Sequence, residues 1–102
     1  MPEQLHAERW IADRALRELP QLRSIARNHA LYWLNMLLMD IRRAEQDAVL
    51  SARKVSAIRK EAVLALGLVG IELERKFGRQ SELDPLWDSA IVRVKAWRDK
   101  IA

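Results

Sequence analysis

Two apolar segments lie at equal distances on either side of the middle of the chain and dominate its hydrophobic pattern. Residues 30–41 (ALYWLNMLLMDI) and 62–73 (AVLALGLVGIEL) are rich in large apolar side chains, and the charged segment between them contains neither proline nor glycine. Helices in globular proteins average about 12 residues, so a turn near Ser51 is favoured over one long rod. The pattern therefore predicts a central antiparallel helical hairpin.

Start and stop signals define four helices. Pro20 lacks an amide hydrogen and disfavours helical geometry in the residue before it, so the first helix is expected to end at Leu19. Gly78 suits the left-handed residue that follows a helix, and Asp84 followed by Pro85 suits a helix start. The sequence predicts an all-α, four-helix antiparallel bundle in a single domain, with helices over residues 3–19, 21–48, 51–77 and 85–101.

The register of the central hairpin follows from the positions of large, small and charged residues. Pairing residues whose numbers sum to about 103 places Trp33 opposite Gly70 and Arg42 opposite Glu61. Large side chains then meet small ones, as close packing prefers. In this register Trp33 belongs to the core. The third and fourth helices are expected to contribute the apolar stripes Val55, Ile58, Ala62, Leu66, Val69 and Leu73, and Trp87, Ala90, Ile91, Val94, Trp97 and Ile101.

The two central helices carry more apolar side chains than one face of a helix can hold. A bundle helix normally buries one stripe, so a helix that is apolar all round is either enclosed or contacts a second molecule. The terminal helices, roughly 25 Å long at 1.5 Å per residue, are too short to enclose the hairpin on every side. We therefore expect a homodimer. Its interface is predicted to use Leu31, Leu38, Leu64, Leu68 and Ile71.

Trp10 lies opposite the apolar stripe of the first helix, on the same side as Arg14 and Arg17. An exposed tryptophan flanked by arginine is typical of a protein–protein interface, because the ring provides a large rigid contact area. The alternative is that Trp10 packs on Arg14 or on the C-terminal end of the chain. The pattern predicts a partner-binding site formed by Trp10, Arg14 and Arg17.

The net charge of +4 is concentrated near the hairpin turn. Residues 42–60 hold six basic and two acidic side chains, which leaves the same excess of +4. A basic tip of this kind can neutralise phosphates, although no aromatic residues lie among the basic ones to stack on bases. A solvated helix end explains the charge equally well. Nucleic-acid binding is therefore the alternative function, with contacts from Arg42, Arg43, Arg53, Lys54, Arg59 and Lys60.

Catalytic and metal chemistry have little support in the sequence. The chain contains no cysteine, which excludes thiolate nucleophiles and disulfides. Glu3 and His6 have the ExxH spacing of carboxylate-bridged di-iron bundles, but such a site needs a second pair. Arg23 and His29 have an R-x5-H spacing that resembles HEPN-type ribonucleases, and this resemblance implies RNA cleavage as a third, less favoured function. We expect no metal, no cofactor and no enzyme activity.

Neither apolar segment is long enough to cross a bilayer, which requires about 20 apolar residues. The N-terminus has no basic head followed by an apolar stretch, so we expect a cytoplasmic protein with no secretory signal. Taken together, the patterns predict a small non-enzymatic helical interaction module. It would act as a regulator, adaptor or inhibitor that binds another protein, as a homodimer.

Overall fold

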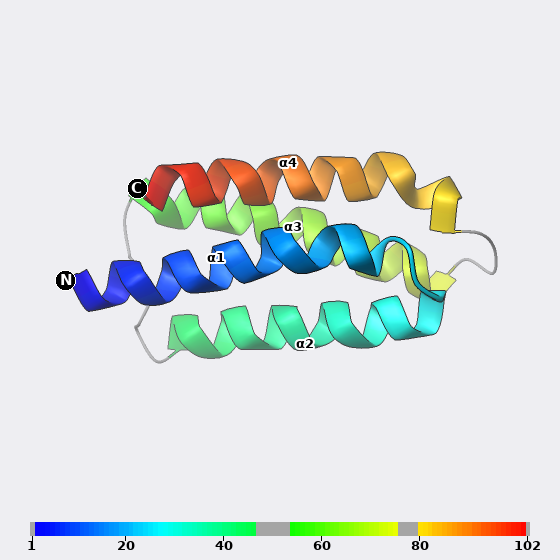
Figure 1. The fold of residues 1–102 in the computed structure, drawn as a ribbon, viewed down its shortest axis with the longest axis horizontal. Coiled ribbons are helices and arrows are strands. Elements are labelled where there is room, and N and C mark those ends of the chain that lie inside the picture. The colour runs from blue at the N-terminus through cyan, green and yellow to red at the C-terminus, as the bar shows by residue number, and fades with distance from the viewer. Residues whose placement is uncertain (1, 47–53, 76–79, 102) are drawn as a thin grey trace.

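The computed structural model describes residues 2–46, 54–75 and 80–101 and is all-α in these ranges (Figure 1). The predicted class, an all-α four-helix antiparallel bundle, is confirmed. Its elements are α1 (Pro2–Leu22), α2 (Arg27–Gln46), α3 (Lys54–Arg75), a 3-10 helix η1 (Gln80–Leu83) and α4 (Asp84–Ile101).

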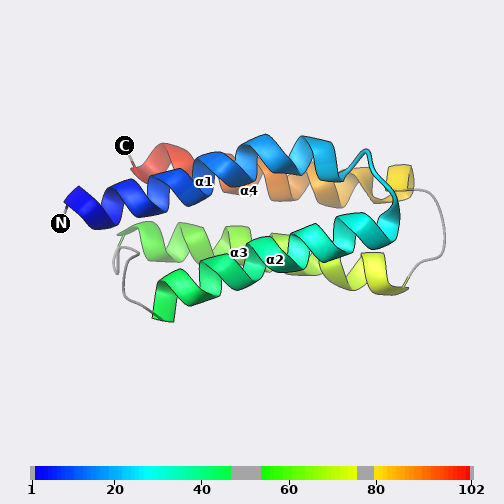
Figure 2. The ribbon, with the colours of Figure 1, turned by 60° about the horizontal axis from the view of Figure 1, so that its bottom comes forward.

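The helices run alternately up and down along the long axis of a body that measures 44 × 21 × 19 Å (Figures 1 and 2). Helix α4 packs on α1 and α3, and α2 packs on the same two helices from the other side. In cross-section α1 therefore lies diagonally opposite α3. The two ends of the chain lie at the same end of the bundle (Figure 1).

The core is formed by the apolar stripes that the periodicity predicts for α3 and α4. Every side chain of those two stripes is buried or half-buried, and Trp87 and Trp97 are fully buried. These two large aromatic side chains, from different turns of α4, contribute much of the apolar contact area of the core. The α1 contribution is Ile11, Ala12, Ala15, Leu19 and Leu22.

The predicted end of the first helix at Leu19 is wrong, because α1 continues through Pro20 to Leu22. Pro20 cannot donate the usual helical hydrogen bond. The additional turn buries Leu22, which is 5% exposed, and the amide of Arg23 still donates to the carbonyl of Leu19 at 3.2 Å. Burial of one more leucine offsets the missing bond, and α2 consequently begins at Arg27 instead of residue 21.

The remaining boundaries agree with prediction to within a few residues where they can be compared. Helix α4 begins at Asp84, immediately before Pro85, as the capping signal predicts. The description of α2 stops at Gln46 and that of α3 covers Lys54–Arg75, so the predicted boundaries at residues 48 and 51 lie outside the described residues. The turn near Ser51 and the predicted end of the third helix at residues 77 and 78 lie outside the described residues.

The predicted register of the hairpin is wrong by one position. A Cβ added to Gly70 would lie 3.7 Å from Leu34 Cδ2, so Leu34, not Trp33, packs against this glycine. Trp33 is turned outward and is 50% exposed, because neighbouring residues of a helix project about 100° apart. Glu61 likewise lies within 3.6 Å of Arg93 of α4, and Arg42 is exposed.

Two charged side chains among the described residues are buried in the interior, which the sequence pattern does not predict. Glu8 of α1 is completely buried, and its Oε2 accepts hydrogen bonds from Arg59 Nη1 at 3.0 Å and from Trp97 Nε1 at 2.6 Å. Arg59 Nε also lies 3.9 Å from Glu45 of α2. Since these residues come from α1, α2, α3 and α4, one polar cluster joins all four helices.

A second ionic contact joins the turn after α1 to the start of α4. Arg23 lies 2.9 Å from Asp84 and 2.7 Å from Asp88, measured from guanidinium nitrogen to carboxylate oxygen. The hydrogen bonds that Arg23 donates to these carboxylates, the one to Asp84 first, raise the pKa of Arg23 above its usual value. Over the described residues, no helix has the length and apolar character that a membrane span requires.

Candidate functional site

The outer surface of α3 carries three exposed aliphatic side chains. Leu64, Leu68 and Ile71 are 69%, 55% and 45% exposed. Their positions follow from the helical period, because the core stripe of α3 uses the opposite side of the same helix. We call these three residues the aliphatic face. Exposed charged residues lie at both of its ends: Lys60, Glu61, Glu74 and Arg75.

A groove runs between the aliphatic face and α4. It has a volume of about 360 Å³. Leu64, Leu68 and Leu86 contribute apolar surface to its walls, and Glu61 lies within 3.6 Å of Arg93 at its rim. This volume is at the low end of the range of about 300–1,000 Å³ that is typical of small-molecule sites. A groove with this volume and lining can accept one or two apolar side chains.

A second groove lies between α1 and α2 and has a volume of about 260 Å³. Its walls are formed by Glu18, Gln21, Leu22, Ile25 and Trp33. The ring of Trp33 meets that of the exposed Tyr32 edge to face, with centroids 5.3 Å apart and planes at 79°. Edge-to-face pairs are a favourable aromatic geometry. We call this the α1–α2 groove, and sequence analysis missed it because it assigned Trp33 to the core.

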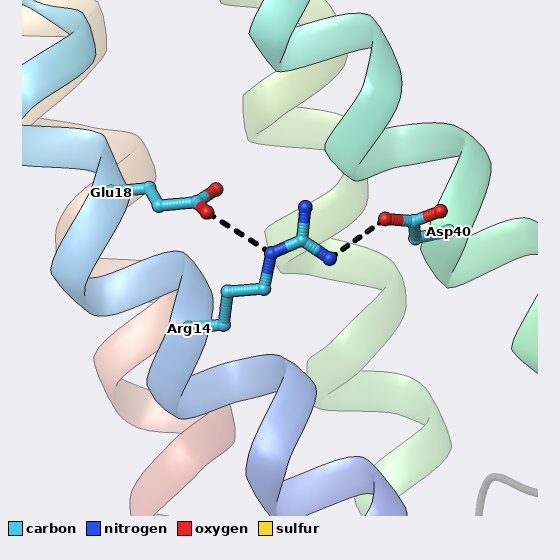
Figure 3. Close-up of polar contacts among 3 residues, drawn as sticks. All are labelled: Arg14, Glu18 and Asp40. Atoms are coloured by element: carbon cyan, nitrogen blue, oxygen red, sulfur yellow. Dashed lines mark hydrogen bonds and ion pairs between the residues drawn. The ribbon is translucent and has the colours of Figure 1, made fainter.

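Arg14 bridges α1 and α2 beside this groove (Figure 3). Its Nε donates to Glu18 Oε1 at 3.0 Å and its Nη1 donates to Asp40 Oδ2 at 2.7 Å. These hydrogen bonds, the one to Asp40 first, raise the pKa of Arg14. The guanidinium carbon lies 5.8 Å from the ring centroid of Trp10, which is 60% exposed. The predicted outward position of Trp10 agrees with the structure, and a fixed cation holds one side of its ring.

The residues predicted for self-association do not all reach the surface. Leu64, Leu68 and Ile71 are exposed, whereas Leu31 is half-buried against the core. Leu38 is only 8% exposed and belongs to the core cluster, so its predicted outward position is wrong. The exposed large apolar side chains of α2 are instead those of Tyr32, Trp33 and Met39.

The basic residues near the hairpin turn do not form one accessible cluster. Arg42, Arg43 and Lys60 are exposed. Arg59 is 4% exposed and bound to Glu8, so its guanidinium is not presented to a phosphate. Arg53 and the side chain of Lys54 lie outside the described residues. The prediction that Arg59 contacts nucleic acid is therefore wrong.

The arginine and histidine with HEPN-like spacing do not lie on one helix. Arg23 follows α1 and contacts Asp84 and Asp88, whereas His29 is exposed in the first turn of α2. Among the described residues no group of three or more histidine or acidic side chains is arranged to hold a metal ion. The side chains of Glu3 and His6 are not among those described.

The fold and its exposed surfaces define a small helical bundle with an aliphatic face on α3 and a groove that contains an exposed tryptophan between α1 and α2. Comparison with known proteins adds no further assignment. No family model matches the chain, and no curated protein and no solved structure matches it significantly.

Proposed function

We propose that this protein is a non-enzymatic helical interaction module that self-associates and binds another protein, as a regulator, adaptor or inhibitor. The observation that carries the proposal is the aliphatic face, where three large apolar side chains are exposed side by side on α3. Clustered apolar side chains rimmed by charges mark interaction surfaces more often than solvated ones.

The energy available from the aliphatic face matches what a weak dimer requires. Full burial of one leucine or isoleucine side chain contributes about 1.5–3 kcal/mol. Because these side chains are 45–69% exposed, the three from each subunit provide at most about 5–10 kcal/mol, whereas association costs about 4–15 kcal/mol in lost freedom of motion. Charged residues around the face must therefore add to the affinity, and the assembly is expected to depend on concentration.

The α1–α2 groove and Trp10 are proposed as the site for the second protein. Trp10 and Trp33 are exposed aromatic side chains of the kind that act as interface anchors. Arg14 and Glu18 lie between them along α1 and present opposite charges that can orient a partner. Trp10 and Arg14 lie on α1, diagonally across the bundle from α3, so a dimer formed through α3 leaves this part of the site accessible on both subunits.

Light scattering at two protein concentrations tests self-association. The mass is expected to rise toward that of a dimer with concentration, and Leu68→Glu is expected to abolish the rise while circular dichroism stays unchanged. Val92→Glu is the matched control, because Val92 is 66% exposed on α4, away from the aliphatic face. A wild-type monomer at every concentration would remove the self-association part of the proposal.

Affinity capture from the native host tests the second part. A protein retained by the wild type and by Val92→Ala, but lost with both Trp10→Ala and Trp33→Ala, would support the α1–α2 site. If the captured protein is still retained by both tryptophan variants, the contact lies elsewhere and the proposed site is contradicted.

Nucleic-acid binding at the hairpin tip is the alternative, supported by the exposure of Arg42, Arg43 and Lys60. It predicts an affinity that falls steeply with salt as counterions are released. A mobility shift at low salt that disappears when these three residues are replaced by glutamate would favour it. The absence of any complex at low salt would dispose of it.

A further inference from the structure

The charged residues at the ends of the aliphatic face are arranged in two lines along α3. Residues seven positions apart on an α-helix project within about 20° of each other. Lys60, Gly67 and Glu74 therefore form one line, with a basic residue at one end and an acidic residue at the other. Gly70, which contacts Leu34, projects still further toward α2, so this line lies on the side of α3 that faces α2.

The second line has the reverse order of charge. Glu61, Leu68 and Arg75 are also spaced by seven residues, with the acidic residue first. Glu61 contacts Arg93 of α4, so this line lies on the α4 side of the helix. Leu64 and Ile71 project between the two lines. Each line thus carries opposite charges at its two ends and an uncharged residue at its centre.

Gly67, at the centre of the first line, has no packing role within the subunit. A Cβ added at Gly67 would meet no atom within 4 Å, whereas one added at Gly70 would contact Leu34. Glycine in the interior of a helix costs about 1 kcal/mol relative to alanine. The fold of the subunit therefore provides no reason for glycine at this position, but the close approach of a second backbone would.

We propose that a second copy of this chain packs on the aliphatic face with its α3 antiparallel to the first, and that the two-fold axis passes beside Gly67. This arrangement rests on the proposed self-association and specifies its geometry. The two-fold axis makes each line face the same line of the second copy, in reverse direction. Lys60 then meets Glu74 of the second copy, and Glu61 meets Arg75 of the second copy, so every charge at the rim finds its opposite.

The direction of the pair follows from two features. A parallel pair would also bring opposite charges together, because each line would then face the other line. Antiparallel packing in addition aligns the helix dipoles in opposite directions, which is the favourable arrangement. It also places Gly67 against Gly67 of the second copy, where the two backbones can approach most closely. Leu64 then faces Ile71 of the second copy on both sides of the axis.

Cysteine cross-linking provides a direct test, because the chain contains no cysteine of its own. Gly67→Cys is expected to form a disulfide-linked dimer under mild oxidation, since the added Cβ atoms face each other across the axis. Lys60→Cys alone should not cross-link, because the two copies of residue 60 lie about 21 Å apart along the helices at 1.5 Å per residue. A mixture of Lys60→Cys and Glu74→Cys chains should form the mixed disulfide.

Each result has a definite meaning. Rapid formation of a mixed disulfide between Lys60→Cys and Glu61→Cys chains would show a parallel pair, in which the two lines face each other, and would overturn the proposal. A dimer detected by light scattering that Gly67→Cys fails to link would also overturn it, while leaving self-association intact. A wild-type protein that stays monomeric at every concentration would contradict both self-association and the antiparallel geometry. The open surroundings of Gly67 make misfolding of Gly67→Cys a minor concern, and circular dichroism checks it.

Charge reversal gives an independent test without cysteine. Lys60→Glu places like charges opposite each other at two symmetry-related positions and is expected to weaken the dimer about three- to tenfold, as rim ion pairs are individually weak. Lys60→Glu combined with Glu74→Lys should restore the affinity. Lys95→Glu, at an exposed lysine of α4, is the matched control and should leave it unchanged. Failure of the double variant to recover would contradict the pairing of residues 60 and 74.

Discussion

Glu8 Oε2 accepts a hydrogen bond of 2.6 Å from Trp97 Nε1, and both side chains are completely buried. The same oxygen lies 3.0 Å from Arg59 Nη1, so a carboxylate and a guanidinium share the interior with an indole. Buried charges are tolerated where each has a partner and further hydrogen bonds. This cluster specifies which side chains of α1, α3 and α4 meet at one level of the bundle.

Removal of Glu8 is expected to destabilise the protein strongly. Glu8→Ala removes the buried carboxylate that accepts a hydrogen bond from Arg59, and breaking a buried ion pair typically costs about 3–5 kcal/mol of unfolding free energy. A small domain has only about 5–15 kcal/mol in total, so the urea midpoint should fall markedly. Glu8→Leu combined with Arg59→Met should recover part of the loss, because the ion pair is removed together while Trp97 Nε1 still loses its acceptor. A single variant that loses under 1 kcal/mol would show that the cluster is not energetically coupled.

The ionic bridge between α1 and α2 is expected to contribute much less. Arg14 and Asp40 side chains are 21% and 35% exposed, so solvent screens their attraction. Asp40→Asn should lower the unfolding free energy by about 1 kcal/mol or less, and added salt should shrink the difference. A double-mutant cycle with Arg14→Met measures the coupling. A loss comparable with that of Glu8→Ala would contradict this assignment.

Replacement of Gly67 by alanine is expected to have opposite effects on the subunit and on the dimer. The isolated subunit should gain up to about 1 kcal/mol in unfolding free energy, because alanine favours the helix and its Cβ meets no neighbour. The dimer should be weakened, because the added methyl groups face each other at the axis. Urea unfolding at low concentration measures the first effect and sedimentation equilibrium the second. If Gly67→Ala raised both the stability of the subunit and the affinity of the dimer, the proposed close approach of the two helices at Gly67 would be contradicted.

Pro20 is expected to limit the stability of α1. It is exposed in the last turn of the helix, so Pro20→Ala restores a backbone donor without changing core contacts. Proline inside a helix costs up to about 3 kcal/mol, and its position near the helix end reduces this, so a gain of about 1 kcal/mol is expected. Thermal unfolding with matched Gln21→Ala as control measures it. A loss of stability would mean that Pro20 is needed for the direction of the following turn.

The sequence predicted the architecture because its signals are periodic and local. The stripes of α3 and α4 and the Asp84–Pro85 start depend on residues close in the chain, and the structure confirms them. The register of α2 against α3 depends instead on how side chains at distant positions interlock. An error of one position turned Trp33 from core to surface and Leu38 from surface to core.

The internal charges escaped prediction for a related reason. A glutamate or arginine is normally assigned to the surface, because burial of an unpaired charge is costly. Glu8 and Arg59 are separated by 51 positions, and only the folded bundle brings them together. The aliphatic face was accessible to sequence reasoning because its surplus of apolar residues is visible without knowledge of contacts. The α1–α2 groove was not, since its existence depends on the outward rotation of one tryptophan.

The position of the chain ends has a practical consequence. Because α1 begins at the end of the bundle where α4 finishes (Figure 1), a peptide linker could join these two helix ends and close the polypeptide into a ring. Ring closure reduces the entropy of the unfolded chain and so favours the native one. Backbone cyclisation is therefore a route to a form of this protein that resists unfolding better and keeps the aliphatic face and the α1–α2 groove unchanged.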